Sequence, residues 1–131
     1  MSAIRGKDTK PELVVRKILY AMGFRYRLHV RALPGTPDIV LSSTRKIINV
    51  HGCFWHLHRC RRGRSTPKTN EKFWDTKRRE NVARDRQARS ALRKIGWDVL
   101  EIWECELGDR VRLINRIEAF LKRENTRRRD T

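Results

Sequence analysis

The chain has 131 residues, a length that fits one domain with a single hydrophobic core and not two independent domains. Its 32 lysines and arginines against 15 aspartates and glutamates give a formal net charge of +17 at pH 7. This charge favours nucleic acid as a partner over a merely soluble basic protein. The four tryptophans do not lie along one amphipathic face, which argues against a membrane-binding surface.

The first predicted element is a helix that Thr9 caps and Gly23 ends. Thr9 with Glu12 three residues later is typical of a capping box, and Pro11 is tolerated in the first turn. The periodicity predicts that its buried face consists of Leu13, Val14, Ile18, Ala21 and Met22.

Strands and helices then alternate along the chain. The patterning predicts strands at 24–30, 38–41, 46–50 and 97–103, and helices at 71–95 and 111–122. The order α-β-β-β-α-β-α predicts an α/β fold with a mixed central sheet flanked by helices. We interpret 1–131 as a single domain that contains a basic loop at 61–69 and a frayed tail at 124–131. No run reaches the ~18 apolar residues of a membrane span, and no signal-peptide core precedes the first helix, so we expect a cytoplasmic protein.

An aspartate stands in an unusual place. Asp38 opens a buried strand directly after a proline turn, where it either caps the turn or belongs to a site. The next strand ends at Val50 and His51, beside Asp38 if the two strands pair as a hairpin. A carboxylate, a strand carbonyl and an imidazole then converge. Oxygen ligands suit Mg²⁺, and magnesium beside a basic surface indicates phosphodiester chemistry.

Cysteines and histidines cluster in one short segment. Residues 51–60 hold three of the four histidines and two of the three cysteines, and an odd cysteine count argues against a disulfide framework. The cluster predicts a closed zinc site made of Cys53, His58, Cys60 and Cys105, against the alternative of buried cysteines and surface histidines. His51 and His56 are left over, and a neutral imidazole there can accept a proton from water. His29 lacks such neighbours in the sequence and is interpreted as structural.

Several segments together resemble the very-short-patch mismatch repair endonucleases, bacterial enzymes of the PD-(D/E)xK nuclease superfamily. The resemblance runs from about Ile4 to Leu121. It is carried by Pro37-Asp38, Val50-His51-Gly52-Cys53-Phe54-Trp55-His56, Asn81-Val82-Ala83-Arg84-Asp85, Gly96-Trp97 and Trp103-Glu104-Cys105. It implies a restriction-endonuclease-like fold with a structural zinc. It also implies an enzyme that nicks the T-containing strand at a T:G mismatch left by deamination of 5-methylcytosine.

The resemblance also implies roles for individual residues. It assigns the acidic metal ligand to Asp38, the catalytic histidines to His51 and His56, and supporting carboxylates to Glu12 and Asp85. It assigns the zinc ligands to the four residues named above and the mismatch-wedging aromatics to Phe54, Trp55 and Trp74. Without the resemblance, helix capping explains Glu12, and pairing with Arg84, Arg86 and Arg89 explains Asp85. Burial in the core would then explain the aromatic side chains.

The mechanism we expect uses one or two Mg²⁺ ions held by Asp38 and the Val50 carbonyl. His56 acts as the general base, with Glu12 orienting it through water. His51, supported by Asp85, contacts the phosphate or a metal-bound water. We expect basic side chains to contact the phosphates of the DNA backbone. They are Arg61, Arg62, Arg64 and Lys68 of the loop and Lys77, Arg78 and Arg79 of the long helix.

Two features depart from the family pattern. Val50 replaces the usual threonine, which is harmless if only its carbonyl binds metal. The chain also begins close to the first helix, without the family's longer DNA-reaching arm; the alternatives are weaker affinity or specificity and an arm that this sequence does not include. We expect a monomer acting on double-stranded DNA, in functional association with mismatch-repair proteins and a cytosine-5 methyltransferase. The alternatives are a homing or mobile-element endonuclease and a non-catalytic zinc-containing DNA-binding module.

Overall fold

The computed structural model describes residues 9–52 and 71–123. The order of elements predicted from the sequence is confirmed, with one short 3-10 helix, η2, in addition. In chain order the elements are α1 (Lys10–Ala21), β1 (Arg27–Leu28), β2 (Ile39–Leu41), β3 (Lys46–His51), α3 (Glu71–Lys94), β4 (Asp98–Trp103), η2 (Glu104–Gly108) and α4 (Arg110–Lys122). Within the described ranges, no helix combines the length and apolarity needed to cross a membrane.

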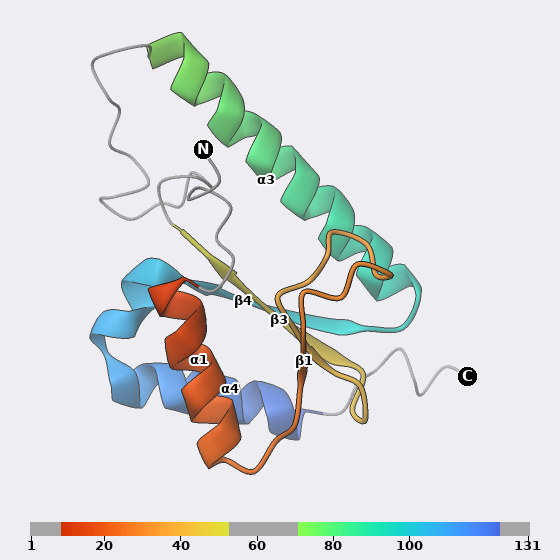
Figure 1. Cartoon of the computed structure of the whole chain (residues 1–131), viewed down its shortest axis with the longest axis vertical. Coiled ribbons are helices and arrows are strands. Elements are labelled where there is room, and N and C mark those ends of the chain that lie inside the picture. Colours follow the sequence, from red (N-terminus) through yellow and green to blue (C-terminus); the bar gives the residue numbers. More distant parts are fainter. Residues whose placement is uncertain (1–8, 53–70, 124–131) are drawn as a thin grey trace.

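The four strands form one mixed sheet in the order β1-β2-β3-β4. β1 with β2 and β2 with β3 are antiparallel pairs, whereas β3 and β4 run parallel. A parallel pair needs a long crossover connection, and α3 lies in that connection, along one side of β3 and β4 (Figure 1). The mixed sheet flanked by helices fits the predicted restriction-endonuclease-like architecture.

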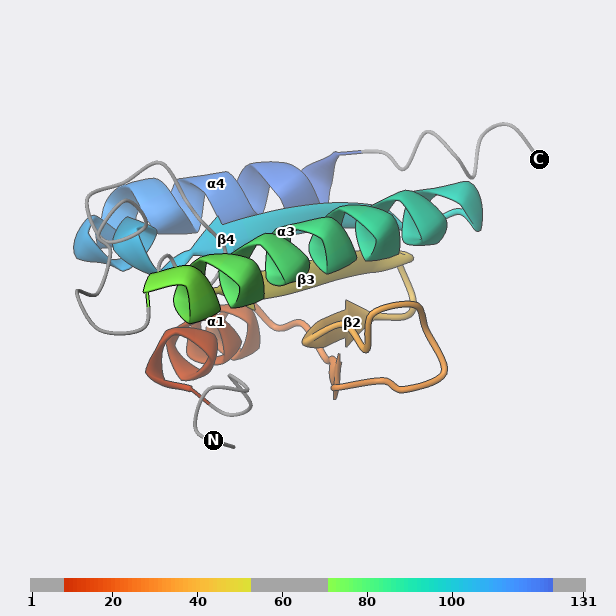
Figure 2. The same cartoon turned by 90° about the horizontal axis from the view of Figure 1, so that it is seen from above.

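Helices cover both faces of the sheet, α1 and α4 on one side and α3 on the other (Figures 1 and 2). Alternate strand residues therefore enter two separate cores. The larger core joins α1 and α4 to the sheet and contains Val15, Leu19, Ile39, Leu41, Ile48, Ile102, Leu113, Ile117 and Phe120. The smaller core lies under α3 and contains Val40, Ile47, Leu92, Trp97 and Val99. Since the central strands are buried on both faces, their apolar runs are nearly continuous.

Two predictions about the N-terminal part were wrong in detail. The buried face of α1 is built on Val15 and Leu19, while Leu13 is 42% exposed and Ala21 is exposed. The strand predicted at 24–30 is only two residues long, because His29 adopts a left-handed backbone conformation with φ 46° that ends the extended run. The alternation of residues 24–30 arises instead from Phe24 and Tyr26 packing against the larger core.

Candidate active site

Asp38 lies directly before β2, where the hairpin with β3 holds both its backbone and its side chain. Asp38 Oδ2 accepts a hydrogen bond from the backbone N–H of Val50 at 2.8 Å. The backbone N–H of Asp38 donates to Asn49 Oδ1 at 3.1 Å. The carboxylate is thereby fixed against the end of β3, and the juxtaposition of Asp38 with Val50 expected from a β2–β3 hairpin is present in the structure.

The environment of Asp38 disfavours its charge. Burial raises the pKa of this carboxyl to about 6, the hydrogen bond from Val50 opposes that rise, and the nearby charge of Glu12 adds to it. A carboxyl group in this state gains most from a bound cation, because a cation stabilises the ionised form where burial and the neighbouring carboxylate do not.

Glu12 belongs to the same centre. It lies in the first turn of α1 and is only 1% exposed. Its backbone N–H donates to Thr9 Oγ1 at 3.4 Å, so the predicted cap is present. The Glu12 carboxylate makes other contacts than those of the predicted capping box. Its Oε2 contacts the guanidinium of Arg16 and lies 2.9 Å from His29 Nε2. Buried and bound in this way, Glu12 is a residue of the centre.

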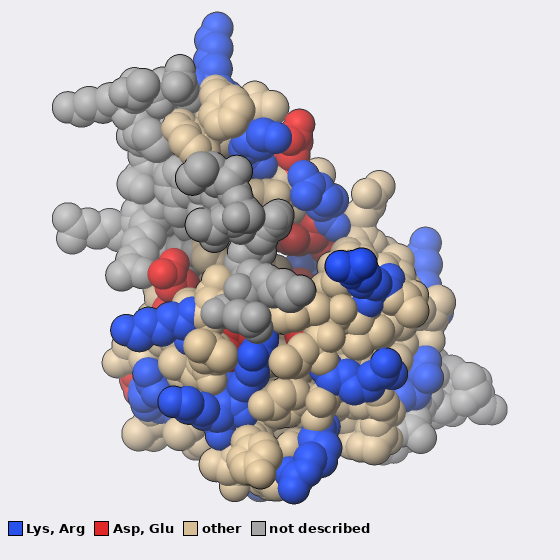
Figure 3. Space-filling view, in the orientation of Figure 1, with Lys and Arg blue, Asp and Glu red and all other residues tan. Residues whose placement is uncertain are grey.

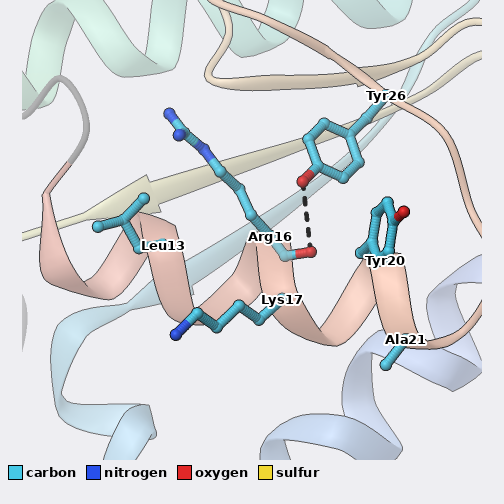
Figure 4. Close-up of a pocket in the computed structure, with 6 residues that line it drawn as sticks. All are labelled: Leu13, Arg16, Lys17, Tyr20, Ala21 and Tyr26. Carbon is cyan, nitrogen blue, oxygen red and sulfur yellow. Dashed lines mark hydrogen bonds between the residues drawn. The ribbon is translucent and has the colours of Figure 1, made fainter.

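His29 is the residue that the sequence interpretation missed. It was expected to lack functional neighbours, but a ring nitrogen of His29 and one oxygen each of Glu12 and Asp38 lie within 4.8 Å of one another. Two contacts, one on each side of β1, bring this part of the chain to the centre. The backbone N–H of His29 donates to the carbonyl of Asp38 at 3.0 Å, and the Tyr26 hydroxyl donates to the backbone carbonyl of Arg16 at 3.5 Å (Figure 4).

Figure 4 also shows an open groove along the outer side of α1. Two basic side chains and two tyrosines contribute to its lining, which consists of Leu13, Arg16, Lys17, Tyr20, Ala21 and Tyr26. Arg16 belongs both to this lining and to the environment of Glu12. The groove therefore borders the acidic centre on the side of α1.

His51, the last residue of β3, lies between two carboxylates. Its Nε2 is 3.2 Å from Glu101 Oε1 on the parallel neighbour β4, and its Nδ1 is 4.0 Å from Asp85 Oδ2 on α3. Glu101 Oε2 in turn accepts a hydrogen bond from Arg89 at 2.6 Å. Because a carboxylate can only accept, Nε2 of His51 is the donor in its bond to Glu101. Asp85, which helical neighbours alone could have explained, therefore faces His51.

These neighbours favour the charged form of the imidazole. Burial by itself lowers the pKa of His51, but the hydrogen bond to Glu101 and the charges of Glu101 and Asp85 outweigh burial and raise this pKa. Burial also raises the pKa of Glu101, yet hydrogen bonds from His51 and Arg89 bring it down to about 2. Both pKa shifts therefore favour the ionised forms of the pair, an imidazolium and a carboxylate. The sequence contained one signal for Glu101: a charged residue in the middle of a strand, between Leu100 and Ile102.

Much of the predicted zinc and DNA-contacting machinery falls outside the described residues. This applies to Cys53, Phe54, Trp55, His56, His58, Cys60, Arg61, Arg62, Arg64 and Lys68. The remaining predicted zinc ligand, Cys105, is exposed in η2. Trp74 is half-buried on α3 and makes an edge-to-face contact with Phe73, with ring centroids 5.0 Å apart.

Basic side chains are spread over the face of the molecule shown in Figure 3, and acidic side chains are sparse between them. On α3, Lys77 and Arg79 are exposed as expected of a surface that meets DNA. Arg78 is different: it is only 3% exposed, so the prediction that it contacts DNA on the surface was wrong. Its helical position turns it toward the protein, whereas its two neighbours face solvent.

Comparison with known proteins places this chain in a family. The profile described as "DNA mismatch endonuclease Vsr" matches residues 1–62. The type II nicking enzyme V.XorIIP of Xanthomonas oryzae pv. oryzae is 46% identical over 122 residues, which cover 93% of this chain and 86% of that protein. V.NmeAIP of Neisseria meningitidis is 42% identical with the same coverage. The DNA mismatch endonuclease Vsr of Escherichia coli is 41% identical over 123 residues, 94% of this chain and 77% of that protein.

Proposed function

Because the chain belongs to the Vsr family of DNA mismatch endonucleases, we propose that it nicks one strand of duplex DNA at T:G mismatches. The mismatches in question arise from deamination of 5-methylcytosine, and the nick starts very-short-patch repair. Double-stranded DNA is then the substrate, in keeping with a formal net charge of +17. Mismatch-repair proteins and a cytosine-5 methyltransferase are its functional partners. The homing and non-catalytic alternatives lose support, because curated relatives at up to 46% identity are nicking enzymes.

The observation that carries the proposal is the half-buried carboxylate of Asp38, directly before β2 and hydrogen-bonded to the end of β3. Its Oδ2 is held at 2.8 Å by Val50 N–H, which places the Val50 peptide beside it. Glu12 contributes a second carboxylate to the same centre. Oxygen donors of this kind fit Mg²⁺, so Asp38 and the Val50 carbonyl are the residues that would hold it. When bound, the ion supplies Lewis-acid stabilisation of the charge that develops on the scissile phosphate.

The chain's own residues supply the remaining chemistry. His51, whose charged form Glu101 and Asp85 favour, is suited to bind a phosphate oxygen. We assign the general base to His56, which lies outside the described residues. Glu101 and Arg89 are positioning residues, since they hold the imidazole of His51 and not the substrate.

Recognition of the mismatch is assigned to aromatic side chains. Apolar wedges between base steps cost a few kcal/mol of unstacking, and base stacking on an aromatic ring returns roughly 1–3 kcal/mol. We assign the wedge to Phe54, Trp55 and Trp74. A zinc held by Cys53, His58, Cys60 and Cys105 fixes the segment that carries the first two of these residues.

The test is a nicking assay on otherwise identical duplexes that contain either T:G or C:G at one position, with Mg²⁺ or with EDTA. Wild type is expected to nick the T strand of the mismatched duplex only when Mg²⁺ is present. Asp38→Asn removes the metal ligand, so nicking falls by about 10³-fold or more, while DNA binding in a gel-shift assay persists.

Asp109→Asn is the matched control. Asp109 caps α4 by accepting a hydrogen bond from Arg112 N–H, and asparagine caps equally well, so full nicking is expected. Near wild-type nicking by Asp38→Asn would place the chemistry elsewhere. Equal nicking of the matched duplex by wild type would refute mismatch specificity.

A further inference from the structure

Three potential ligand atoms from separate segments of the chain meet at one point. Glu12 comes from the first turn of α1, His29 from the residue after β1, and Asp38 from the residue before β2. One ligand atom of each lies within 4.8 Å of the other two. The backbone bond from His29 N–H to the Asp38 carbonyl, 3.0 Å long, fixes two of the three segments against each other.

One carboxylate oxygen of Glu12 is available as a metal ligand at this point. Its Oε2 is engaged by Arg16 and lies close to His29, but within the described part of the chain its Oε1 is buried without a hydrogen-bond partner. Nε2 of His29 is also buried, and none of the described residues makes a well-aligned hydrogen bond to it despite the 2.9 Å to Glu12. Buried polar atoms of this kind are costly unless something binds them, and a cation would satisfy both.

We infer that Glu12, His29 and Asp38 together bind one divalent cation, with His29 supplying a nitrogen ligand. The inference rests on the proposed nuclease function, because Asp38 serves both. The inference goes beyond that function because it concerns which divalent ion the site selects. Mg²⁺ takes oxygen ligands and keeps its waters, whereas imidazole suits transition metals. The site therefore favours divalent transition-metal ions over Mg²⁺, and His29 determines this selectivity; Mn²⁺ serves as the probe because its binding can be followed by magnetic resonance.

Metal binding can be measured directly, without DNA. Mn²⁺ is titrated into the protein while electron paramagnetic resonance follows the free ion, and Mg²⁺ is added as a competitor. Electron spin echo modulation of the bound Mn²⁺ reports a directly coordinated ¹⁴N. His29→Asn removes the imidazole and keeps a residue that tolerates the φ of 46° at this position. His51→Gln is the control, since it removes another imidazole whose Nε2 is bonded to Glu101.

Wild type and His51→Gln are expected to show ¹⁴N modulation. His29→Asn is expected to lose it and to bind Mn²⁺ about tenfold or more weakly, with Mg²⁺ affinity little changed. Glu12→Gln should weaken the binding of both ions. Thermal melting without metal checks that the variants fold, and if His29→Asn does not fold, His29→Asp, which also tolerates the positive φ, takes its place with the same expected loss of ¹⁴N modulation.

Two results would overturn the inference: wild-type Mn²⁺ without ¹⁴N modulation, or modulation and affinity that persist in folded His29→Asn. Either result would leave the nicking function standing if Mg²⁺ still supports cleavage. Conversely, a His29-dependent Mn²⁺ site in a protein that nicks no duplex would refute the proposed function and keep the metal site.

Discussion

Glu101→Gln tests whether the ion pair behind His51 stabilises the fold. The side chain of Glu101 is 14% exposed and contacts both His51 and Arg89. In the folded protein the pKa of Glu101 is about 2, against an ordinary 4.5. At about 1.4 kcal/mol per pKa unit this difference corresponds to about 3 kcal/mol, and partial solvent screening reduces the expected contribution to about 2 kcal/mol. Glutamine fills the same space and removes the charge, so the free energy of unfolding should fall by about that amount.

The pH dependence identifies the cause. Because the folded pKa is depressed, the stabilisation is complete above pH 4.5 and is lost as the pH falls toward 2. The pKa of His51 is raised, so its share is complete below the ordinary pKa of 6.5 and is lost as the pH rises through the folded value. Wild type and Glu101→Gln should therefore differ most near pH 5.5, differ clearly less at pH 3, and converge as the pH falls toward 2.

Urea unfolding followed by circular dichroism measures both variants at pH 3, 4, 5.5 and 7. Glu106→Gln is the matched control, because Glu106 pairs with Arg116, whose side chain is 42% exposed. That surface pair should contribute less than about 1 kcal/mol. A destabilisation by Glu101→Gln that stays constant from pH 3 to pH 7 would mean that packing and not charge is responsible. No destabilisation at pH 5.5 would refute the proposed ion pair.

Two further predictions concern the segments around the sheet. Purified protein should contain about one zinc per chain, and Cys105→Ser should lose the metal and lower the melting temperature; a well-folded, metal-free wild type would contradict this. Phe54→Ala and Trp55→Ala should keep their zinc and bind matched DNA as wild type does, but lose preference for T:G, and 2-aminopurine beside the mismatch should brighten less on binding. Folded variants with full mismatch discrimination would refute the wedge.

Local signals in the sequence determined the order of the elements and, within the site, the contact between Asp38 and Val50. Gly23 and Gly96, both with φ near 90° or above, end α1 and α3 where glycine predicted it. The short turn after Leu41 brings β3 back antiparallel to β2, so pairing alone places Val50 beside Asp38. Such features are readable because they depend on residues near one another in the chain.

Only the tertiary structure decided the rest. The meeting of Glu12 with His29 and of His51 with Glu101 depends on how α1 packs on the sheet and on which strand becomes the parallel neighbour of β3. In the sequence, His29 stands among arginines and is indistinguishable from a residue that faces solvent. These two pairs are separated by 17 and 50 positions in the chain, so no local periodicity predicts their contacts. Burial of apolar faces brings the segments together, and the polar groups on those segments come into contact as a consequence.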